Sequence, residues 1–183
     1  MRFVKVFLIS GFIATSIAAQ AQVRGNISAS STCGQSVVHQ MATVGDEGQH
    51  TISLDQRVCA WSPAIVIGGM QGTRYTATGV DDVQFDKSRD RGYAVGTVEN
   101  GDKYFLSYDG TATMNGPAPV HLEGLWYFTG GTGKLAGLKG SGTYKARPTA
   151  DGRMAFVIEG VYTISAIPSK DLRQVVCAEL VSK

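Results

Sequence analysis

Two residues that could move a proton stand close together in the segment PVHLEGLWYFTG: His121 and Glu123. On a β-strand, residues two apart point to the same face, so an inward-facing pair could pass a proton to and from a substrate. His121 and Glu123 are therefore the candidate catalytic residues. The alternative is that this pair lies on the wet outer face, with the apolar residues of the other parity, including Trp126, inside.

The aromatic and basic residues near glycines are the candidates for ligand binding. They are Trp126, Tyr104 in KYFLSYDG, Tyr93 in GYAVGTVE and Arg74 in QGTRYTATG. Tyrosines on strands also pack against each other across a sheet, which is the alternative role for Tyr93 and Tyr104. The alternative for Arg74 is a solvated rim.

Metal binding and serine hydrolysis find no support in the residue spacing. The three histidines are not spaced as ligands of one ion, and the cysteines form no C-x-x-C pair. A G-x-S-x-G elbow is missing from the sequence. We therefore expect no metal.

The glycine-rich run TGGTGKLAGLKGSGTYK, residues 129 to 145, could hold a phosphate. It lacks the Walker pattern, although residues 131 to 136 match G-x-G-x-x-A. That fingerprint requires a helix after the loop, and Gly137, Gly140 and Gly142 would each weaken a helix by about 1 kcal/mol relative to alanine. We interpret Gly130 to Gly133 as a turn and the following residues as a strand kinked by glycines. No cofactor is expected.

The pattern from Phe128 to Gly142, aromatic-T-G-G-T-G-K-L-x-G-x-x-G-x-G, resembles the GGTG segment of allene oxide cyclases, dirigent proteins and uncharacterised secreted bacterial relatives. The resemblance implies an eight-stranded antiparallel barrel with an apolar cavity. The enzymes of these families steer the cyclisation or coupling of reactive organic substrates. The matching residues are structural glycines and threonines, so no catalytic residue is carried over to this chain.

Short β-rich runs bounded by turn residues recur along the chain. The predicted strands are 37–44, 49–58, 64–68, 73–86, 91–99, 103–114, 119–129, 135–146 and 153–165. Hairpin turns are predicted at Asp86 to Gly92, Asn100-Gly101 and Asp151-Gly152. The sequence thus predicts an all-β fold: a single antiparallel up-and-down β-barrel of about eight to nine strands. The tail from residue 169 could be a closing strand or a short helix.

The N-terminal residues predict export. Arg2 and Lys5 precede an apolar run that ends at the small triplet Ala19-Gln20-Ala21, which is typical of a signal peptide spanning residues 1–21. We interpret residues 22–36 as a flexible lead-in and 37–183 as the barrel domain. The product is expected to be secreted or periplasmic, without membrane insertion after cleavage.

The charge of the chain without residues 1–21 argues against nucleic acid as a partner. Removing Arg2 and Lys5 lowers the basic count from 17 to 15, which equals the 15 acidic residues. A neutral chain with scattered basic residues has no electrostatic footprint for nucleic acid.

The three cysteines, Cys33, Cys59 and Cys177, suggest one disulfide in an oxidising compartment. Cys33 and Cys59 each lie 13 residues from Asp46, the centre of the turn signal VGDEG, so a hairpin centred there would place them opposite each other. We predict this pairing. The alternatives are Cys59 with Cys177, or three buried thiols.

These features leave three functional hypotheses. The first is a barrel that binds a small apolar molecule in its cavity, which would be its partner. The second is a cyclase-like or isomerase-like enzyme acting on a small organic substrate. The third is a structural envelope protein with a filled barrel. The oligomeric state is left open.

Overall fold

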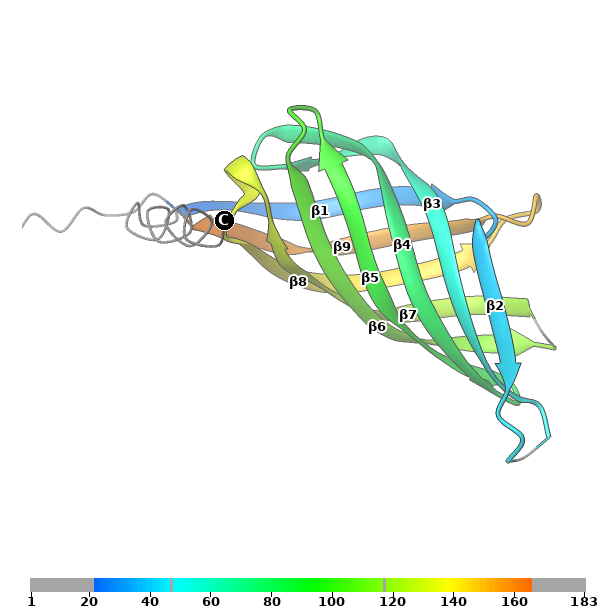
Figure 1. Ribbon diagram of the computed structural model, residues 1–183. Coiled ribbons are helices and arrows are strands. Elements are labelled where there is room, and N and C mark those ends of the chain that lie inside the picture. The colour runs from blue at the N-terminus through cyan, green and yellow to red at the C-terminus, as the bar shows by residue number, and fades with distance from the viewer. Residues whose placement is uncertain (1–21, 47, 117, 166–183) are drawn as a thin grey trace, which may run out of the picture.

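The structure is a computed structural model that describes residues 22–46, 48–116 and 118–165 (Figure 1). The predicted signal peptide, Cys177 and the C-terminal tail lie outside the described residues. The elements are β1 (Gln22–Cys33), β2 (Val38–Thr43), β3 (His50–Ile67), β4 (Met70–Gln84), β5 (Lys87–Val98), β6 (Lys103–Asn115), β7 (Ala118–Gly131), the short 3₁₀ helix η1 (Gly133–Leu135), β8 (Leu138–Pro148) and β9 (Met154–Ser165).

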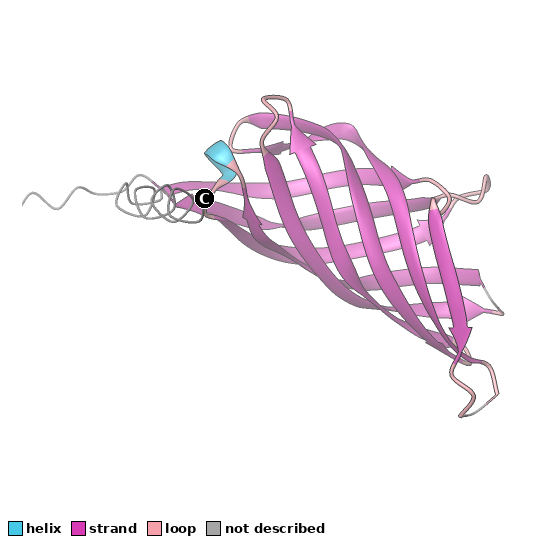
Figure 2. Ribbon diagram, in the orientation of Figure 1, coloured by secondary structure: helices cyan, strands magenta, loops and turns pink. Residues whose placement is uncertain are grey.

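The strands form an antiparallel sheet in the order β1-β9-β8-β7-β6-β5-β4-β3-β2, and an additional pairing of β1 with β3 closes it. Eight strands, β1 and β3 to β9, thus make an up-and-down barrel, and β2 is a ninth strand that pairs with the first half of β3. Figures 1 and 2 show the tilted strands of this barrel, with β2 at the end opposite η1. The predicted fold class is confirmed.

The prediction that residues 22–36 are a flexible lead-in is wrong. Residues 22–33 form β1, which pairs with β9 along its whole length and with β3 at its end. The inward-facing residues of the second half of β1 are Ile27, Ala29, Ser31 and Cys33. Ala29 is small and Ser31 is polar, so the inward-facing residues differ little in hydrophobicity from the outward-facing ones. The sequence signal for this strand was therefore weak.

The glycine-rich run connects β7 to β8 through η1, as the turn interpretation predicted. Its backbone is held by the neighbouring β5–β6 turn: the Lys134 N–H donates to the Asp102 carboxylate at 2.8 Å, and the Lys103 N–H donates to Thr132 Oγ1 at 2.8 Å. A Cβ at Gly133 would collide with the Asp102 carboxylate, and its φ of +51° favours glycine. Leu135, fully buried, packs into the core at this end of the barrel.

Glycine pairs on neighbouring strands make room for aromatic rings inside the barrel. A Cβ added at Gly79 would lie 2.2 Å from the Tyr108 hydroxyl oxygen, and one at its cross-strand partner Gly92 would lie 2.5 Å from it. Two further sets repeat this arrangement. The three sets are Gly79 and Gly92 under Tyr108, Gly110 and Gly124 under Tyr144, and Gly142 and Gly160 under Trp126. In each set the ring folds back over two adjacent strands of the wall.

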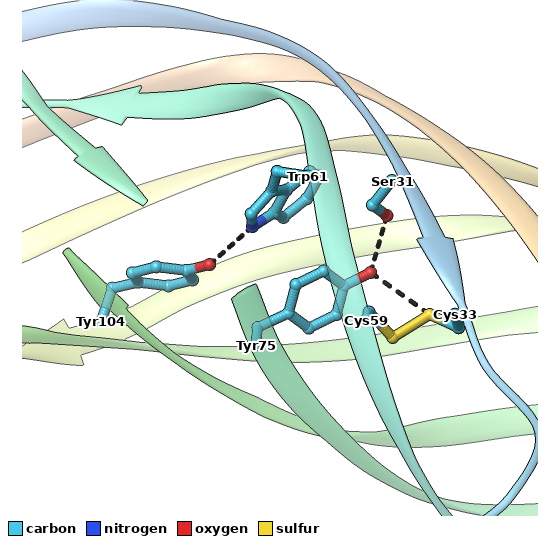
Figure 3. The surroundings of a disulfide bond; sticks show 6 residues. All are labelled: Ser31, Cys33, Cys59, Trp61, Tyr75 and Tyr104. Carbon is cyan, nitrogen blue, oxygen red and sulfur yellow. Dashed lines mark hydrogen bonds between the residues drawn. A yellow bond between two sulfur atoms is a disulfide. The ribbon is translucent and has the colours of Figure 1, made fainter. Parts of the chain in front are cut away.

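The barrel closes where Cys33 of β1 faces Cys59 of β3, and the two form the predicted disulfide (Figure 3). The β2–β3 hairpin brings them together, although the register changes slightly between β2 and β1. The alternative pairing of Cys59 with Cys177 is wrong. Next to the bridge, the Tyr75 hydroxyl lies 2.8 Å from Ser31 Oγ and 3.6 Å from Cys33 Sγ.

Candidate functional site: a cavity inside the barrel

A cavity of about 430 Å³ lies inside the barrel. It extends from Trp61 and Trp126 to His39 and Met41 of β2, at the end of the barrel opposite η1. One part of its wall is apolar and aromatic. That part includes Leu106, Leu122, Trp126, Phe156 and Ile158.

Trp126 lines the cavity, and its indole N–H donates to the Thr143 carbonyl oxygen at 3.1 Å. Leu122 and Phe128 share its inward face. His121 and Glu123 therefore point outward, where their side chains lie 3.3 Å apart and the Glu123 side chain is 59% exposed. Neither side chain belongs to the cavity wall. Their catalytic role stays a prediction.

The other three predicted ligand residues lie elsewhere. Tyr104 is fully buried beside the cavity, and its hydroxyl accepts a hydrogen bond of 2.8 Å from the Trp61 indole N–H (Figure 3). Tyr93 is 69% exposed on the outer face of β5. Arg74 is exposed and borders a shallow outer depression with Tyr75 and Val95. The structure thus brings Trp126 alone of the four into the cavity wall.

The polar part of the cavity wall comes from residues that the sequence analysis did not select. Asp81 on β4 and Asp90 on β5 are cross-strand partners, and both line the cavity with Ser88. Asp90 is buried, with 8% of its surface exposed, and the Tyr144 O–H donates to it at 3.4 Å. The signal for this site was available: Ser88 and Asp90 share strand parity with the inward-facing Ala94. It was missed because residues 86 to 92 resembled a turn, whereas the turn is centred on Phe85 and Asp86.

Asp55, the third acidic residue of the wall, has its own partners. Ser36 Oγ donates to its carboxylate, His39 Nδ1 lies 3.2 Å from it, and Arg57 lies 3.5 Å away. Burial alone would raise the pKa of Asp55, but the hydrogen bonds from Ser36 and His39 and the charge of Arg57 outweigh it and lower the pKa. This carboxylate is therefore ionised and locally compensated.

The pKa values of Asp90 and Asp81 are raised, in contrast to that of Asp55. Burial, together with the charge of Asp81, raises the pKa of Asp90 to about 7, against the opposing hydrogen bond from Tyr144. Burial also raises the pKa of Asp81, with a second contribution from the charge of Asp55. Burial, together with the charge of Asp90, raises the pKa of Tyr108 and of Tyr144. At neutral pH, Asp90 can therefore exchange a proton inside a largely apolar cavity.

Within residues 22–46, 48–116 and 118–165, no group of three or more histidine, cysteine, aspartate or glutamate side chains is arranged to hold a metal ion. The same residues include no helix with the length and apolar character needed to cross a membrane.

Comparisons with known proteins return a similarity of fold only. No protein-family model matches the chain, and no curated protein matches its sequence. Among solved structures, the chain is similar to a pterocarpan synthase dirigent protein at 10% sequence identity and a TM-score of 0.47, over 82% of this chain and 90% of that one. This similar structure is a dirigent protein, one of the families that the GGTG segment resembles.

Proposed function

We propose that this protein binds a small, largely apolar molecule inside its barrel. The observation that carries the proposal is the cavity of about 430 Å³, walled mainly by aromatic and aliphatic side chains. Ligand sites in proteins are typically concave and apolar, have volumes of about 300 to 1,000 Å³, and carry a few polar groups that orient the ligand. The wall has this composition, because its mainly apolar side chains are joined by polar ones that include Asp81, Ser88 and Asp90.

The cavity favours a binding protein over a structural barrel filled with side chains. Eight-stranded barrels have room for packed side chains or for one small ligand. Here Tyr108, Tyr144 and Trp126 fold back over glycines of the wall instead of filling the centre. This arrangement supports the ligand-binding alternative.

We further propose that the protein works outside the cytoplasm. The Cys33–Cys59 disulfide supports this location, because such bonds persist in oxidising compartments. The signal peptide of residues 1–21, which lies outside the described residues, stays a sequence-based prediction of the same location.

Native mass spectrometry tests the binding proposal on protein exported with its own leader and purified without detergent. We expect an adduct on the wild type and its loss in Ala77→Phe, because Ala77 lines the cavity and a larger side chain would occupy it. Ala60→Phe, on the exposed outer face of β3, is the matched control and should keep the adduct. An adduct that persists in the Ala77→Phe protein, with circular dichroism showing that the protein is folded, would place binding elsewhere.

A second candidate function is proton transfer on the bound molecule, as in an isomerase or cyclase. It is favoured by Asp90, whose pKa of about 7 lets it donate or accept a proton at neutral pH beside the Tyr144 hydroxyl. The co-purified compound would be incubated with protein in D₂O. Deuterium incorporation by the wild type and its loss in Asp90→Asn would support this function, whereas no incorporation by the wild type would reject it.

A further inference from the structure

We infer that the polar side of the cavity, formed by Asp81, Ser88 and Asp90, is a subsite for a protonated amine. The ligand would then be an apolar amine rather than a neutral apolar molecule. The inference rests on the proposed binding function and specifies its ligand class.

The first argument is the position of the two carboxyl groups. Asp81 and Asp90 are cross-strand partners on β4 and β5, and both line the cavity. Directly opposed residues of an antiparallel pair have Cβ atoms about 4.5 to 5.5 Å apart. Two like charges at this separation disfavour each other, whereas one cation between them would stabilise both.

The second argument is the shortage of hydrogen-bond donors at the subsite. Within the described residues, the Asp90 carboxylate accepts one hydrogen bond, from the Tyr144 hydroxyl at 3.4 Å, and the Asp81 carboxylate accepts one, from Ser53 Oγ at 3.5 Å. Both bonds are long for an O–H donor and a carboxylate. A primary ammonium group brings three N–H donors and no acceptor, and therefore matches this deficit.

The third argument is Ser88, which is 4% exposed and belongs to the cavity wall. Its hydroxyl is buried and has no hydrogen-bond partner among the described residues. An unpaired buried hydroxyl is energetically costly, so natural proteins rarely retain one without a partner. Ser88 Oγ can accept a hydrogen bond from the same ammonium group that contacts Asp90, two residues along the inward face of β5.

The fourth argument is the charge balance around the subsite. The charged and titratable groups of the surrounding wall are His39, Asp55, Arg57, Tyr75, Asp81, Asp90, Tyr108 and Tyr144. Arg57 and His39 both contact Asp55, and Arg57 compensates its charge. Arg57 acts on Asp81 and Asp90 through its field, without an ion pair to either. Once Asp81 and Asp90 ionise, the subsite is therefore short of positive charge.

The rest of the cavity suits the apolar part of such a ligand. Trp126, Leu106 and Phe156 supply apolar and aromatic wall, and Tyr108 also lines the cavity. Aromatic faces also attract an organic cation that lies over them. An amine attached to an aromatic or branched apolar body would thus place each of its parts against matching chemistry.

Isothermal titration calorimetry with tryptamine and tryptophol tests the inference, because these probes share an indole-ethyl body and differ in carrying an amine or a hydroxyl. At pH 8 we expect tryptamine to bind about tenfold or more tightly, as charge-assisted hydrogen bonds are the stronger class. Asp90→Asn should remove most of this preference by weakening the binding of tryptamine much more than that of tryptophol. Asp109→Asn, which removes an exposed carboxylate on the outer face of β6, is the matched control and should change neither affinity.

The pH dependence supplies a second readout. Both probes keep their charge between pH 5 and pH 8, whereas Asp90 becomes protonated over this range as the pH falls. Tryptamine should therefore bind more weakly at pH 5 than at pH 8, and tryptophol should bind equally at both.

Equal affinity for the two probes, or a tryptamine preference that survives in Asp90→Asn, would overturn the amine subsite and leave the proposed binding function standing. Failure of both probes to bind would also overturn the amine inference. In that case the adduct comparison between wild type and Ala77→Phe decides the binding function independently.

Discussion

Cys33 and Cys59 are cross-strand partners at the seam that turns the sheet into a barrel, with Cα atoms 3.9 Å apart. The paired register of this seam spans three residue pairs, from Ser31 with Trp61 to Cys33 with Cys59, whereas β1 pairs with β9 over its whole length. The disulfide thus reinforces the shortest strand pairing of the eight-stranded barrel.

Replacing both cysteines of the bridge by serine should lower the free energy of unfolding by about 3 kcal/mol. The two cysteines are 26 residues apart, and closing a loop of this size restricts the unfolded chain by roughly that amount. Thermal and denaturant unfolding of the wild type and the double variant measure the loss. Reduced wild type should match the variant, and an unchanged stability would show that the seam holds without the bridge.

Because of Asp90, the free energy of unfolding should fall as the pH rises from about 4 to about 7. An unfolded aspartate has a pKa near 3.8, and the folded value is about 7, so in this window the folded protein holds a proton that the unfolded chain has lost. Stability contributed by this group is present below the window and is lost as the pH rises through it.

Asp90→Asn should therefore be more stable than the wild type at pH 8, by an amount on the order of a few kcal/mol. The difference should shrink towards pH 4. Asp55 keeps its partners in both proteins, so the comparison reports on Asp90 together with its coupling to Asp81. Parallel curves of stability against pH would contradict the assignment.

Gly79→Ala should destabilise the protein by about 1 to 3 kcal/mol, because the new methyl group would meet the Tyr108 hydroxyl. Tyr108→Phe removes the colliding oxygen, so the double variant should lose less stability than the two single variants together. A double-mutant cycle in urea measures this coupling. Additive losses would show that the ring and the glycine do not constrain each other.

Glu123→Gln should change stability by less than about 0.5 kcal/mol and leave ligand binding intact. Its carboxylate is exposed and its contact with His121 lies on the outer surface, where such pairs contribute little. Thermal unfolding and calorimetry measure both quantities. The sequence-based assignment of His121 and Glu123 as catalytic makes a separate prediction, which is a loss of turnover in this variant.

The sequence was sufficient for most of the fold, because antiparallel neighbours in a meander are neighbours in the chain and their turns carry recognisable residues. Asn100-Gly101 and Asp151-Gly152 lie in turns as predicted. The strand β1 was not predicted because the polar Ser31 faces inward next to the disulfide. The inward-facing and outward-facing residues of β1 therefore differ less in hydrophobicity than is usual for a strand.

The candidate site was harder to predict than the fold. Trp126 was one of two parity alternatives for its strand, whereas Asp90 depends on where β5 begins. The predicted strand begins at residue 91 instead of Lys87, so Asp90 was assigned to a turn. In addition, aspartate usually lies in turns and on surfaces, so a buried aspartate is not expected from its residue type. The pairing of Asp81 with Asp90 also requires the register of two strands, which their composition does not specify.

The three glycine pairs under Tyr108, Tyr144 and Trp126 explain why the interior is hollow. An aromatic side chain on a narrow barrel would normally project towards the axis and fill it. Here each ring packs against the glycines of two neighbouring strands, so it forms part of the cavity wall instead of blocking the centre. The space for a guest is therefore specified by residues that have no side chain, and enlarging any one of them would displace a ring whose own strand lies one or two strands away.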